Sequence, residues 1–468
     1  MLRILNKVIF GFILISITTL YSCEKTVEIA APLNEITTPL VFSSDKLAAG
    51  ALAGVYTGIA QANTQSNDLT IYSSLLADDL SYLGVNPSLV EVGSNGYTAL
   101  STFQNSIFSD WYSIIYRANL VIEGLQKYEG TSAKVKKQYT AEAKVIRAYC
   151  YFNLVNTFGD VPLIKETDVT VTGLLPRETT ANIYRQIIED LTAGKTDLAA
   201  DYSGSSNTRL GVNKFVATAL LARTYLFLGD YQAAESNASE VIASALYRLI
   251  PAENMETGVW VKNNPESIWQ MSSPLNIANQ YTIEASTLLF GLPGNSQYDI
   301  RSSFVSLFEQ TDLRRQKWMR EYRVGTLVRT LPYKYKYPTN AEAVAANVAE
   351  APTVLRLAEQ YLIRAEARAR IGTNLDGARS DMNQIRIRAR ATVSTTASAS
   401  GLIQEILLEN RRELFCEQAF RWNNLKRTGE ADAVLTVLKP GFRPIAKLLP
   451  IPQANIDANP NLIQTEGY

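Results

Sequence analysis

The sequence of 468 residues contains no histidine, and this absence restricts its chemistry more than any other property. Histidine is the commonest general base of enzymes and the commonest protein ligand of zinc. The adjacent carboxylates Asp78 and Asp79 do not replace it, because neighbouring side chains diverge on a helix or a strand and glycoside hydrolysis needs two carboxylates ~5–9 Å apart. We therefore expect a protein that is not an enzyme, with these two residues at a helix end or in hydrogen bonds.

Cysteine is also scarce, with three in the chain. Cys150 and Cys416 lie within apolar helical patterns, which favours small buried side chains over halves of a disulfide, although the sequence leaves a bridge between them open. The third, Cys23, follows a targeting segment. This distribution offers no set of thiolates to a metal ion, so we expect neither a metal nor a cofactor.

Neither sign of charge is in excess, since Lys plus Arg and Asp plus Glu number 45 each. Proteins that hold nucleic acid need a surplus of Lys and Arg to neutralise phosphates, and we expect no nucleic-acid partner. With 19% charged and 46% hydrophobic residues, the composition is that of a globular protein that can bury a large core.

Long apolar runs are missing apart from Val8–Leu20, which follows a basic start. Its 13 residues fit the ~7–15 of a signal peptide and fall short of the ~20 of a membrane-spanning helix. The run ends in LYSC, which has the leucine, the small residue and the cysteine of a lipoprotein cleavage site. We predict a lipoprotein signal peptide over residues 1–22, acylation of Cys23 as a stable membrane anchor, and a tether over residues 23–45. An ordinary secretory signal is the alternative.

Apolar residues recur at helical spacing through much of the chain. We expect helices over Asp45–Ala60, Gln138–Phe158 and Ile183–Leu198. Two stretches of equal length, Asn213–Leu246 and Ala358–Ala391, each predict two helices separated by a turn that contains glycine, with alanines at the helix crossings. Their length matches the helix–turn–helix period of tetratricopeptide repeats, which is about 34 residues. Unrelated helical hairpins of similar length are the alternative.

Residues 248–350 lack this periodicity and are rich in aromatic and amide side chains. We expect a short strand in SIWQMS and a short helix at Ser303–Gln310. The stretch from Tyr72 to Tyr97 has the Ser, Gly, Asn and Tyr content of surface loops, which often carry binding groups. Aromatic faces flanked by hydrogen-bonding groups suit the stacking of sugar rings, whereas a second small core beneath long loops is the alternative. The candidate ligand-binding residues are Tyr82, Asn95, Tyr97, Tyr281, Tyr298 and Trp318.

Near the C-terminus, apolar side chains at helical spacing predict one long helix over Leu402–Arg427. Arg411 falls in the middle of its apolar side. An arginine cannot shed its proton and is costly to bury alone, so we expect a carboxylate from another helix beside it, with Glu366 and Glu142 as the candidates. The alternative is that Arg411 extends to water at a helix crossing.

The sequence changes character after Gly429, where prolines forbid further long helix. Apolar residues between these prolines are expected to anchor an extended tail across the helical body; they are Leu448, Leu449, Ile451, Ile456 and Leu462.

These C-terminal patterns carry a family resemblance. ENRRELFCEQAFRWNNLKRTG followed by LLPIPQANIDANPNLIQTEGY resembles the C-terminal signature of the SusD/RagB family, surface lipoproteins that bind nutrients at the outer membrane of Bacteroidetes. The resemblance continues upstream through RAEARARIG and ARSDMNQIRIRA. It recurs in the first half as YRANLVIEGL, AEAKVIRAYCYFNLVNTFGDVPL and GVNKFVATALLARTYLFLGDYQAAESNASEVI. Two departures are Gln418, where the family usually has glycine, and Asn423-Asn424, where an acidic residue is common.

The resemblance implies a mostly α fold: a tetratricopeptide-like helical scaffold with a loop-rich insertion and an extended C-terminal tail. It divides the mature chain into an N-terminal SusD-like region, residues 46–247, and a C-terminal RagB/SusD region, residues 248–468, with the insertion at 248–350. In the family, loops of the insertion and of the N-terminal quarter form the ligand site.

The function implied is that of a lipid-anchored protein on the exterior of the outer membrane. It would capture oligosaccharide and pass it to a SusC-type TonB-dependent transporter, over which it sits as a hinged lid. Two alternatives are a peptide-binding lid of the RagB type and a tetratricopeptide-type scaffold that binds only proteins.

Overall fold

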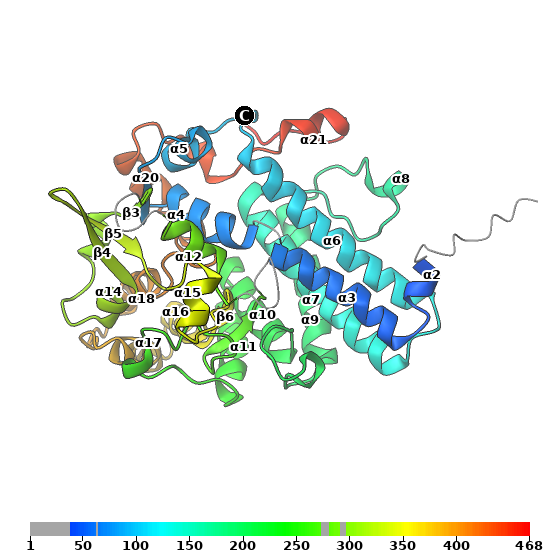
Figure 1. Cartoon of the computed structure of the whole chain (residues 1–468), viewed down its shortest axis with the longest axis horizontal. Coiled ribbons are helices and arrows are strands. Elements are labelled where there is room, and N and C mark those ends of the chain that lie inside the picture. The colour runs from blue at the N-terminus through cyan, green and yellow to red at the C-terminus, as the bar shows by residue number, and fades with distance from the viewer. Residues whose placement is uncertain (1–37, 62–63, 273–279, 291–295) are drawn as a thin grey trace, which may run out of the picture.

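The computed structural model describes residues 38–61, 64–272, 280–290 and 296–468 (Figure 1). The predicted signal peptide, Cys23 and the tether as far as residue 37 lie outside the described residues. The expected mostly α class is confirmed, because helices make up most of the molecule and strands form only three two-stranded sheets within the described part of the chain.

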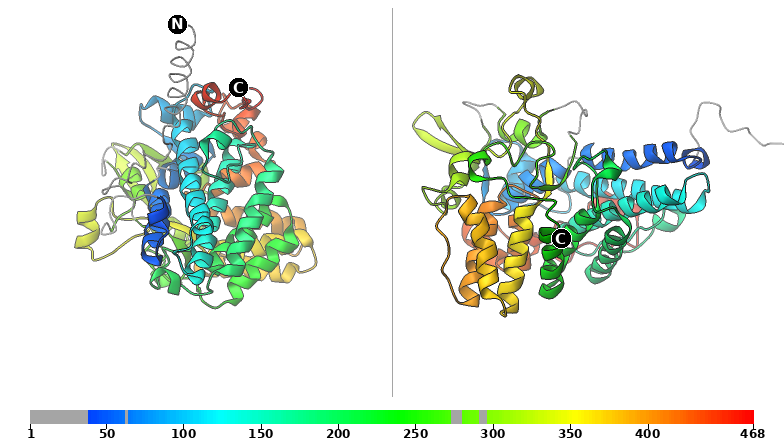
Figure 2. Two further views of the ribbon diagram at one scale, coloured as in Figure 1. Left: turned by 90° about the vertical axis from the view of Figure 1, so that its right-hand side faces the viewer. Right: turned by 90° about the horizontal axis from the view of Figure 1, so that it is seen from below.

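Long helices build the N-terminal half, and Figures 1 and 2 show them running side by side. Their bounds are α3 (Asp45–Gln61), α6 (Phe103–Lys127), α7 (Ala133–Phe158) and α9 (Thr180–Asp197), with the short elements α2 (Thr38–Val41), η1 (Thr64–Tyr72), α4 (Ser73–Leu76), α5 (Pro87–Ser94) and α8 (Val169–Thr172) between or before them. The three helices predicted here are thus confirmed. Helix α7 is buried along most of its length by α6 and α9, which explains why apolar and small residues occur on all its sides.

The two predicted hairpins are also confirmed. Each turns at a glycine in the left-handed region, Gly229 (φ 77°) and Gly372 (φ 81°), where a side chain would be strained. Alanines and two larger apolar residues pack the hairpins against each other. Figure 2 shows the green helices of the first hairpin beside the yellow helix of the second. Their membership of the tetratricopeptide class stays a prediction. The helices are α10 (Lys214–Leu228), α11 (Tyr231–Ala243), α16 (Leu357–Ile371) and α17 (Leu375–Arg388).

The prediction of one helix over Leu402–Arg427 is wrong. Helix α18 ends at Glu413 and α19 begins at Phe420, and three residues between them have positive φ: Cys416 (52°), Gln418 (44°) and Ala419 (56°). The helices of the C-terminal part are α18 (Ala399–Glu413), α19 (Phe420–Arg427), α20 (Ala431–Leu438), η4 (Pro444–Lys447) and α21 (Gln453–Ala458).

The physical reason for this break lies in another part of the chain. The carbonyl of Glu413, which a continuous helix would use internally, instead accepts hydrogen bonds from Arg356 Nη2 (2.8 Å) and Lys334 Nζ (2.9 Å). The amide of Ala419 donates to the carbonyl of Leu69 (2.6 Å). Tertiary hydrogen bonds therefore replace those of the helix.

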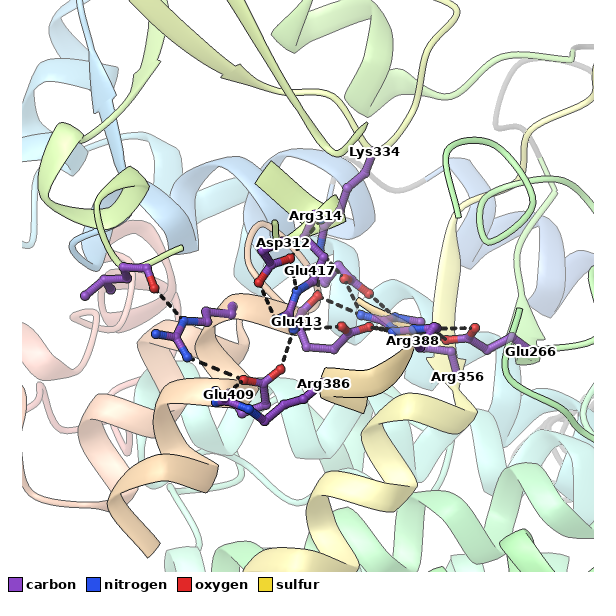
Figure 3. A network of polar contacts seen from close by, with 12 residues as sticks. Glu266, Asp312, Arg314, Lys334, Arg356, Arg386, Arg388, Glu409, Glu413 and Glu417 are labelled. Carbon is purple, nitrogen blue, oxygen red and sulfur yellow. Dashed lines mark hydrogen bonds and ion pairs between the residues drawn. The ribbon is translucent and has the colours of Figure 1, made fainter. Parts of the chain in front are cut away.

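A buried ion network surrounds the same point (Figure 3). The carboxylate of Glu413 contacts three arginines: Arg314 at 3.2 Å, and Arg356 and Arg388 at closer range. Burial alone would raise the pKa of Glu413, but these three charges outweigh it and hold the pKa well below its usual range. Each of the three arginines also pairs with at least one further carboxylate; these are Glu266, Asp312, Glu409 and Glu417. The network fastens α18 to the insertion.

Arg411 does pair with carboxylates, but neither predicted partner is correct. Its guanidinium contacts Asp78 (2.9 Å) and Asp79 (2.8 Å), and Asp79 lies 332 positions earlier in the chain. Glu366 pairs instead with Arg427 (2.6 Å) and Arg370, and Glu142 accepts a hydrogen bond from Tyr56 (2.5 Å). The expectation that Asp78 and Asp79 serve as hydrogen-bonding groups is confirmed.

Three antiparallel sheets lie in and beside the insertion. The strand predicted in SIWQMS is confirmed as β2, whereas the helix expected at Ser303–Gln310 shortens to α13 (Ser302–Val305). The pairs are β1 (Leu80–Tyr82) with β3 (Tyr298–Ile300), β2 (Ser267–Gln270) with β6 (Thr353–Arg356), and β4 (Met319–Val324) with β5 (Leu327–Pro332). The other short elements are η2 (Ser203–Ser205), η3 (Ala252–Asn254), α12 (Ile283–Leu288), α14 (Leu313–Lys317) and α15 (Asn340–Ala345).

The C-terminal tail lies across the helical body, as predicted. Leu449, Ile451 and Leu462 are buried, and the Leu449 amide donates to the carbonyl of Thr157 (2.8 Å). Cys150 and Cys416 are buried free thiols, which settles the open question of a bridge between them.

Candidate ligand-binding site

The β1–β3 sheet joins the two regions that were expected to carry the ligand site. Its register places Tyr82 opposite Tyr298, with ring centroids 5.6 Å apart and ring planes at 54°. The Tyr82 hydroxyl donates to Gln297 Oε1 (3.2 Å) and accepts from the amide of Asn86 (3.2 Å), the residue that caps α5. An aromatic pair from distant parts of the chain is therefore held in a fixed orientation.

Beside this pair lies an open cavity of about 310 Å³. Its wall contains the hydroxyl side chains Ser286 and Thr287 of α12, Phe290, the amide of Gln297, and Tyr298. Phe290 is 71% exposed, which is unusual for so large an apolar side chain. Burial, followed by the nearby phenols of Tyr82 and Tyr72, raises the pKa of Tyr298, so its hydroxyl keeps its proton as a hydrogen-bond donor. Apolar rings next to amide and hydroxyl groups form a surface suited to a sugar.

The six predicted ligand residues divide into two groups. Tyr82 and Tyr281 are half-buried at the surface, and Tyr298 is almost covered but borders the cavity. The other three, Asn95, Tyr97 and Trp318, are fully buried.

Two of the buried residues, Tyr97 and Trp318, make contacts within the protein interior. Tyr97 donates to the carbonyl of Ala446 and stacks on Tyr468, which holds the C-terminal tail. Trp318 donates from Nε1 to the carbonyl of Met255 (2.8 Å) and meets Trp260 edge to face. Tyr97 and Trp318 are therefore interior residues and not ligand contacts, but the core they belong to is not a small separate one: together with Trp260 and Trp269 they are part of the large core that also contains the N-terminal helices.

Four of the five residues in the cavity wall, Ser286, Thr287, Phe290 and Gln297, were not among the predicted ligand residues. Composition could not single them out, because the insertion has many aromatic and amide residues. The pairing of β1 with β3, which brings Gln297 and Tyr298 next to Tyr82, is a long-range contact that the sequence alone does not reveal.

A larger cavity, of about 490 Å³, lies between α3, α7, the loop 204–211 and residues 269–272. Its wall is mainly apolar and includes the buried carboxyl of Glu142, which accepts hydrogen bonds from Tyr56 (2.5 Å) and Gln138 (3.0 Å). Burial raises the pKa of Glu142 to about 7, although these two hydrogen bonds oppose the shift.

Within the described residues, no group of three or more His, Cys, Asp or Glu side chains has the arrangement of a metal site. Likewise, none of the helices in that part of the chain is both long and apolar enough to cross a bilayer.

Comparison with known proteins adds to this geometry. Residues 33–226 match a SusD-like family model described as starch-binding and associating with the outer membrane, and residues 323–468 match the model of the SusD family that includes RagB. The two matches lie in the order expected for one protein and together span most of the chain. The chain belongs to the SusD/RagB family.

Similarity to individual SusD/RagB proteins extends over nearly the full length. A SusD-like protein of Formosa agariphila, P25, is 22% identical over 100% of this chain and 99% of its own. The structure of a SusD homologue from Bacteroides thetaiotaomicron has a TM-score of 0.78 at 19% identity, over 92% of this chain and 98% of that one. That of surface glycan-binding protein A from Bacteroides fluxus has a TM-score of 0.72 at 21% identity, over 90% and 99%. These likenesses show the fold.

Both departures from the SusD/RagB pattern have a structural explanation. Gln418 has a φ of 44°, in the region that favours the glycine usual in the family, and its side chain accepts a hydrogen bond from Tyr149 (2.7 Å). Asn424, where an acidic residue is common, still accepts from Arg427 Nε (2.7 Å) and also donates to Asn410.

Proposed function

We propose that this SusD/RagB protein binds an oligosaccharide at the face formed by Tyr82, Phe290, Gln297 and Tyr298. The observation that carries the proposal is the exposed ring of Phe290 beside a cavity whose other walls are hydroxyl and amide groups. The ring offers an apolar surface to the C–H face of a sugar. The polar groups accept hydrogen bonds from its hydroxyls or donate hydrogen bonds to them.

Membership of the family supports a carbohydrate ligand. One matching family model is described as starch-binding, and a relative of the same fold is a surface glycan-binding protein. We propose no catalytic step, and turnover of a glycan by the purified protein would contradict this part of the proposal.

The cellular role that we propose follows the family. Cys23 is acylated and anchors the protein to the outer membrane, facing the cell exterior, and a SusC-type TonB-dependent transporter receives the captured oligosaccharide. A hinged lid of this kind needs only modest affinity, because different affinities of the ligand for the open and closed states shift their populations. Isolation of the tagged lipoprotein from solubilised outer membranes should recover a barrel protein, and recovery of none would count against the partnership.

Ligand binding is tested on the purified ectodomain with a glycan panel, followed by calorimetry of the ligands found. Phe290→Ala should weaken binding about tenfold, the equivalent of about 1.4 kcal/mol and within the range of aromatic stacking. Tyr82→Ala should act in the same direction because it removes the partner of both Gln297 and Tyr298.

The matched control is Tyr116→Ala, which removes an exposed tyrosine from α6, outside the cavity wall. Equal affinities for wild type, Phe290→Ala and Tyr82→Ala would reject this face as the binding site. An ectodomain that binds peptides and no glycan would point to the RagB type of ligand instead.

A further inference from the structure

A third cavity, of about 350 Å³, has Tyr82 in its wall. It lies among β1, α5 and the segment that follows α20, and its wall contains Ser81, Arg301 and Lys439. Tyr82 borders this cavity and also donates a hydrogen bond to Gln297 in the wall of the cavity beside Phe290, so the two cavities lie close to each other. The wall of the third cavity has two cationic side chains and no carboxylate.

Arg301 is the notable residue of this cavity. Its Nε is buried and has no hydrogen-bond partner within the described residues, and its guanidinium forms no ion pair with any of them. Carboxylates are nevertheless close in the chain and in space, since the Arg301 amide donates to the carbonyl of Asp79 (3.0 Å). A buried guanidinium donor without an acceptor is costly.

The nearby carboxylates pair with other arginines. Asp78 pairs with Arg421 (2.6 Å), and Asp79 pairs with Arg411 through Oδ1 (2.8 Å), whereas Asp79 Oδ2 is buried and has no hydrogen-bond partner among the described residues. Asp299, two residues before Arg301, pairs with Arg329 (3.1 Å) and accepts from the amide of Thr330. The protein therefore supplies acceptors to the surrounding arginines and leaves Arg301 without one.

Lys439 adds a second positive charge. Its ammonium group is buried and donates to the carbonyls of Leu75 and Leu76 (2.5 and 2.8 Å) and to Asn95 Oδ1 (2.6 Å). Burial lowers the pKa of Lys439 to about 7; the charge of Arg301 acts in the same direction and that of Asp78 in the opposite one. Because Arg301 and Lys439 line the same cavity, an anion bound there would offset its positive charge and supply the acceptor that Arg301 lacks.

We infer that this cavity binds an anionic substituent of the oligosaccharide, a carboxylate or a sulfate ester, with Arg301 as its principal donor. The guanidinium suits both groups because its planar donors bind paired oxygens. The inference rests on the proposed glycan-binding function and narrows its ligand to acidic oligosaccharides, which would place one sugar at Phe290 and an acidic group at Arg301.

Calorimetry with three probes tests the inference: an oligogalacturonate, a sulfated carrageenan oligosaccharide and a neutral malto-oligosaccharide of similar length. The variants are Arg301→Gln and, as a matched loss of one exposed positive charge, Arg323→Gln on β4. We expect at least one acidic probe to bind wild type, with affinity reduced about tenfold or more in Arg301→Gln, as for a charged hydrogen bond. Arg323→Gln should keep wild-type affinity, and Arg301→Lys should lie between the two.

A thermal-shift measurement with inorganic sulfate tests the anion site at Arg301 separately from the proposed binding of a glycan. Sulfate that raises the Tm of wild type, but not of Arg301→Gln, supports the anion site even if no glycan binds and the proposed function fails. Neutral probes that bind as tightly as acidic ones, with Arg301→Gln unchanged, overturn the anion site and leave glycan binding intact. Absence of both sulfate protection and acidic preference likewise overturns it.

Discussion

Arginines in two regions of this molecule meet different surroundings. In the C-terminal core, Arg356 is fully buried and contacts Glu266, Glu413 and Glu417. At the cavity beside β1, Arg301 is half-buried and has no carboxylate partner among the described residues. The core uses its charges to hold segments together, whereas the cavity keeps a charge available. Paired charges thus define the fold, and an unpaired charge at a cavity indicates a binding site.

The strongest test of this comparison removes a charge from the core. Arg356→Gln should lower the free energy of unfolding by about 3–5 kcal/mol, because it removes one cation from three buried carboxylates, Glu266, Glu413 and Glu417, and one of the two donors to the Glu413 carbonyl. Chemical denaturation at neutral pH measures the loss. Arg323→Gln, at an exposed position, should change it by less than about 0.5 kcal/mol, and a similarly small effect of Arg356→Gln would contradict the structural role of the network.

Aromatic side chains allow a parallel test, in which the expected loss of stability is similar to that of Arg356→Gln. Trp318→Ala should cost about 3–5 kcal/mol of stability because it empties a closely packed site next to Trp260. Phe290→Ala should leave stability almost unchanged, since that ring is largely exposed, and should reduce ligand affinity instead. A stable Trp318→Ala variant that had lost glycan binding would mean that Trp318 contacts the ligand after all.

Glu142 is the acidic counterpart of Arg301. Its carboxyl is buried, and its hydrogen-bond partners, Tyr56 and Gln138, carry no positive charge. Its pKa is raised in the folded state to about 7, from an ordinary value of 4.5. The folded state therefore binds the proton more tightly, and the stability that this proton contributes is present below pH 4.5 and is lost as the pH rises to about 7. The loss amounts to at most about 3 kcal/mol.

Glu142→Gln should reduce the fall in the free energy of unfolding between pH 4.5 and 7.5, as measured by denaturation at intervals across this range. The control is Glu129→Gln, at a carboxyl that is 90% exposed. A wild-type protein whose stability did not fall across this window would show that Glu142 is ionised at little cost.

The smallest expected effect on stability belongs to Arg301→Gln. Because Arg301 has no ionic partner to lose, the substitution should change the free energy of unfolding by less than about 0.5 kcal/mol, while Arg356→Gln, the same chemical change, is severe. Denaturation of the two variants side by side gives the contrast directly. A loss of several kcal/mol for Arg301→Gln would show that it serves the fold and not a ligand.

Local patterns were sufficient for most of the predicted helices. The hairpins at 213–246 and 358–391 were predicted because apolar spacing, alanines and a turn glycine all act over a few residues. The strand in SIWQMS and the anchored tail were predicted for the same reason. The resemblance of the C-terminal motifs identified the family, which the matches to residues 33–226 and 323–468 confirm.

Features set by distant contacts could not be predicted in this way. The break after Glu413 has no proline or glycine to announce it and depends on donors from Arg356 and Lys334. Asp79, which pairs with Arg411, lies 332 positions away from it in the chain. Composition drew attention to Trp318 and Tyr97, but it does not distinguish an aromatic residue of the core from one at the surface, because both occur in loop-rich segments.

The pairing of β1 with β3 has a consequence for biosynthesis. Tyr82 and Gln297 are 215 positions apart, so the proposed ligand-binding face cannot form until translation has passed well beyond the middle of the chain. A truncated product that stops before residue 298 keeps most of the N-terminal helices and still lacks one side of that face. Nonsense mutations that stop the chain before residue 298 should therefore abolish binding at this face even when the fragment accumulates.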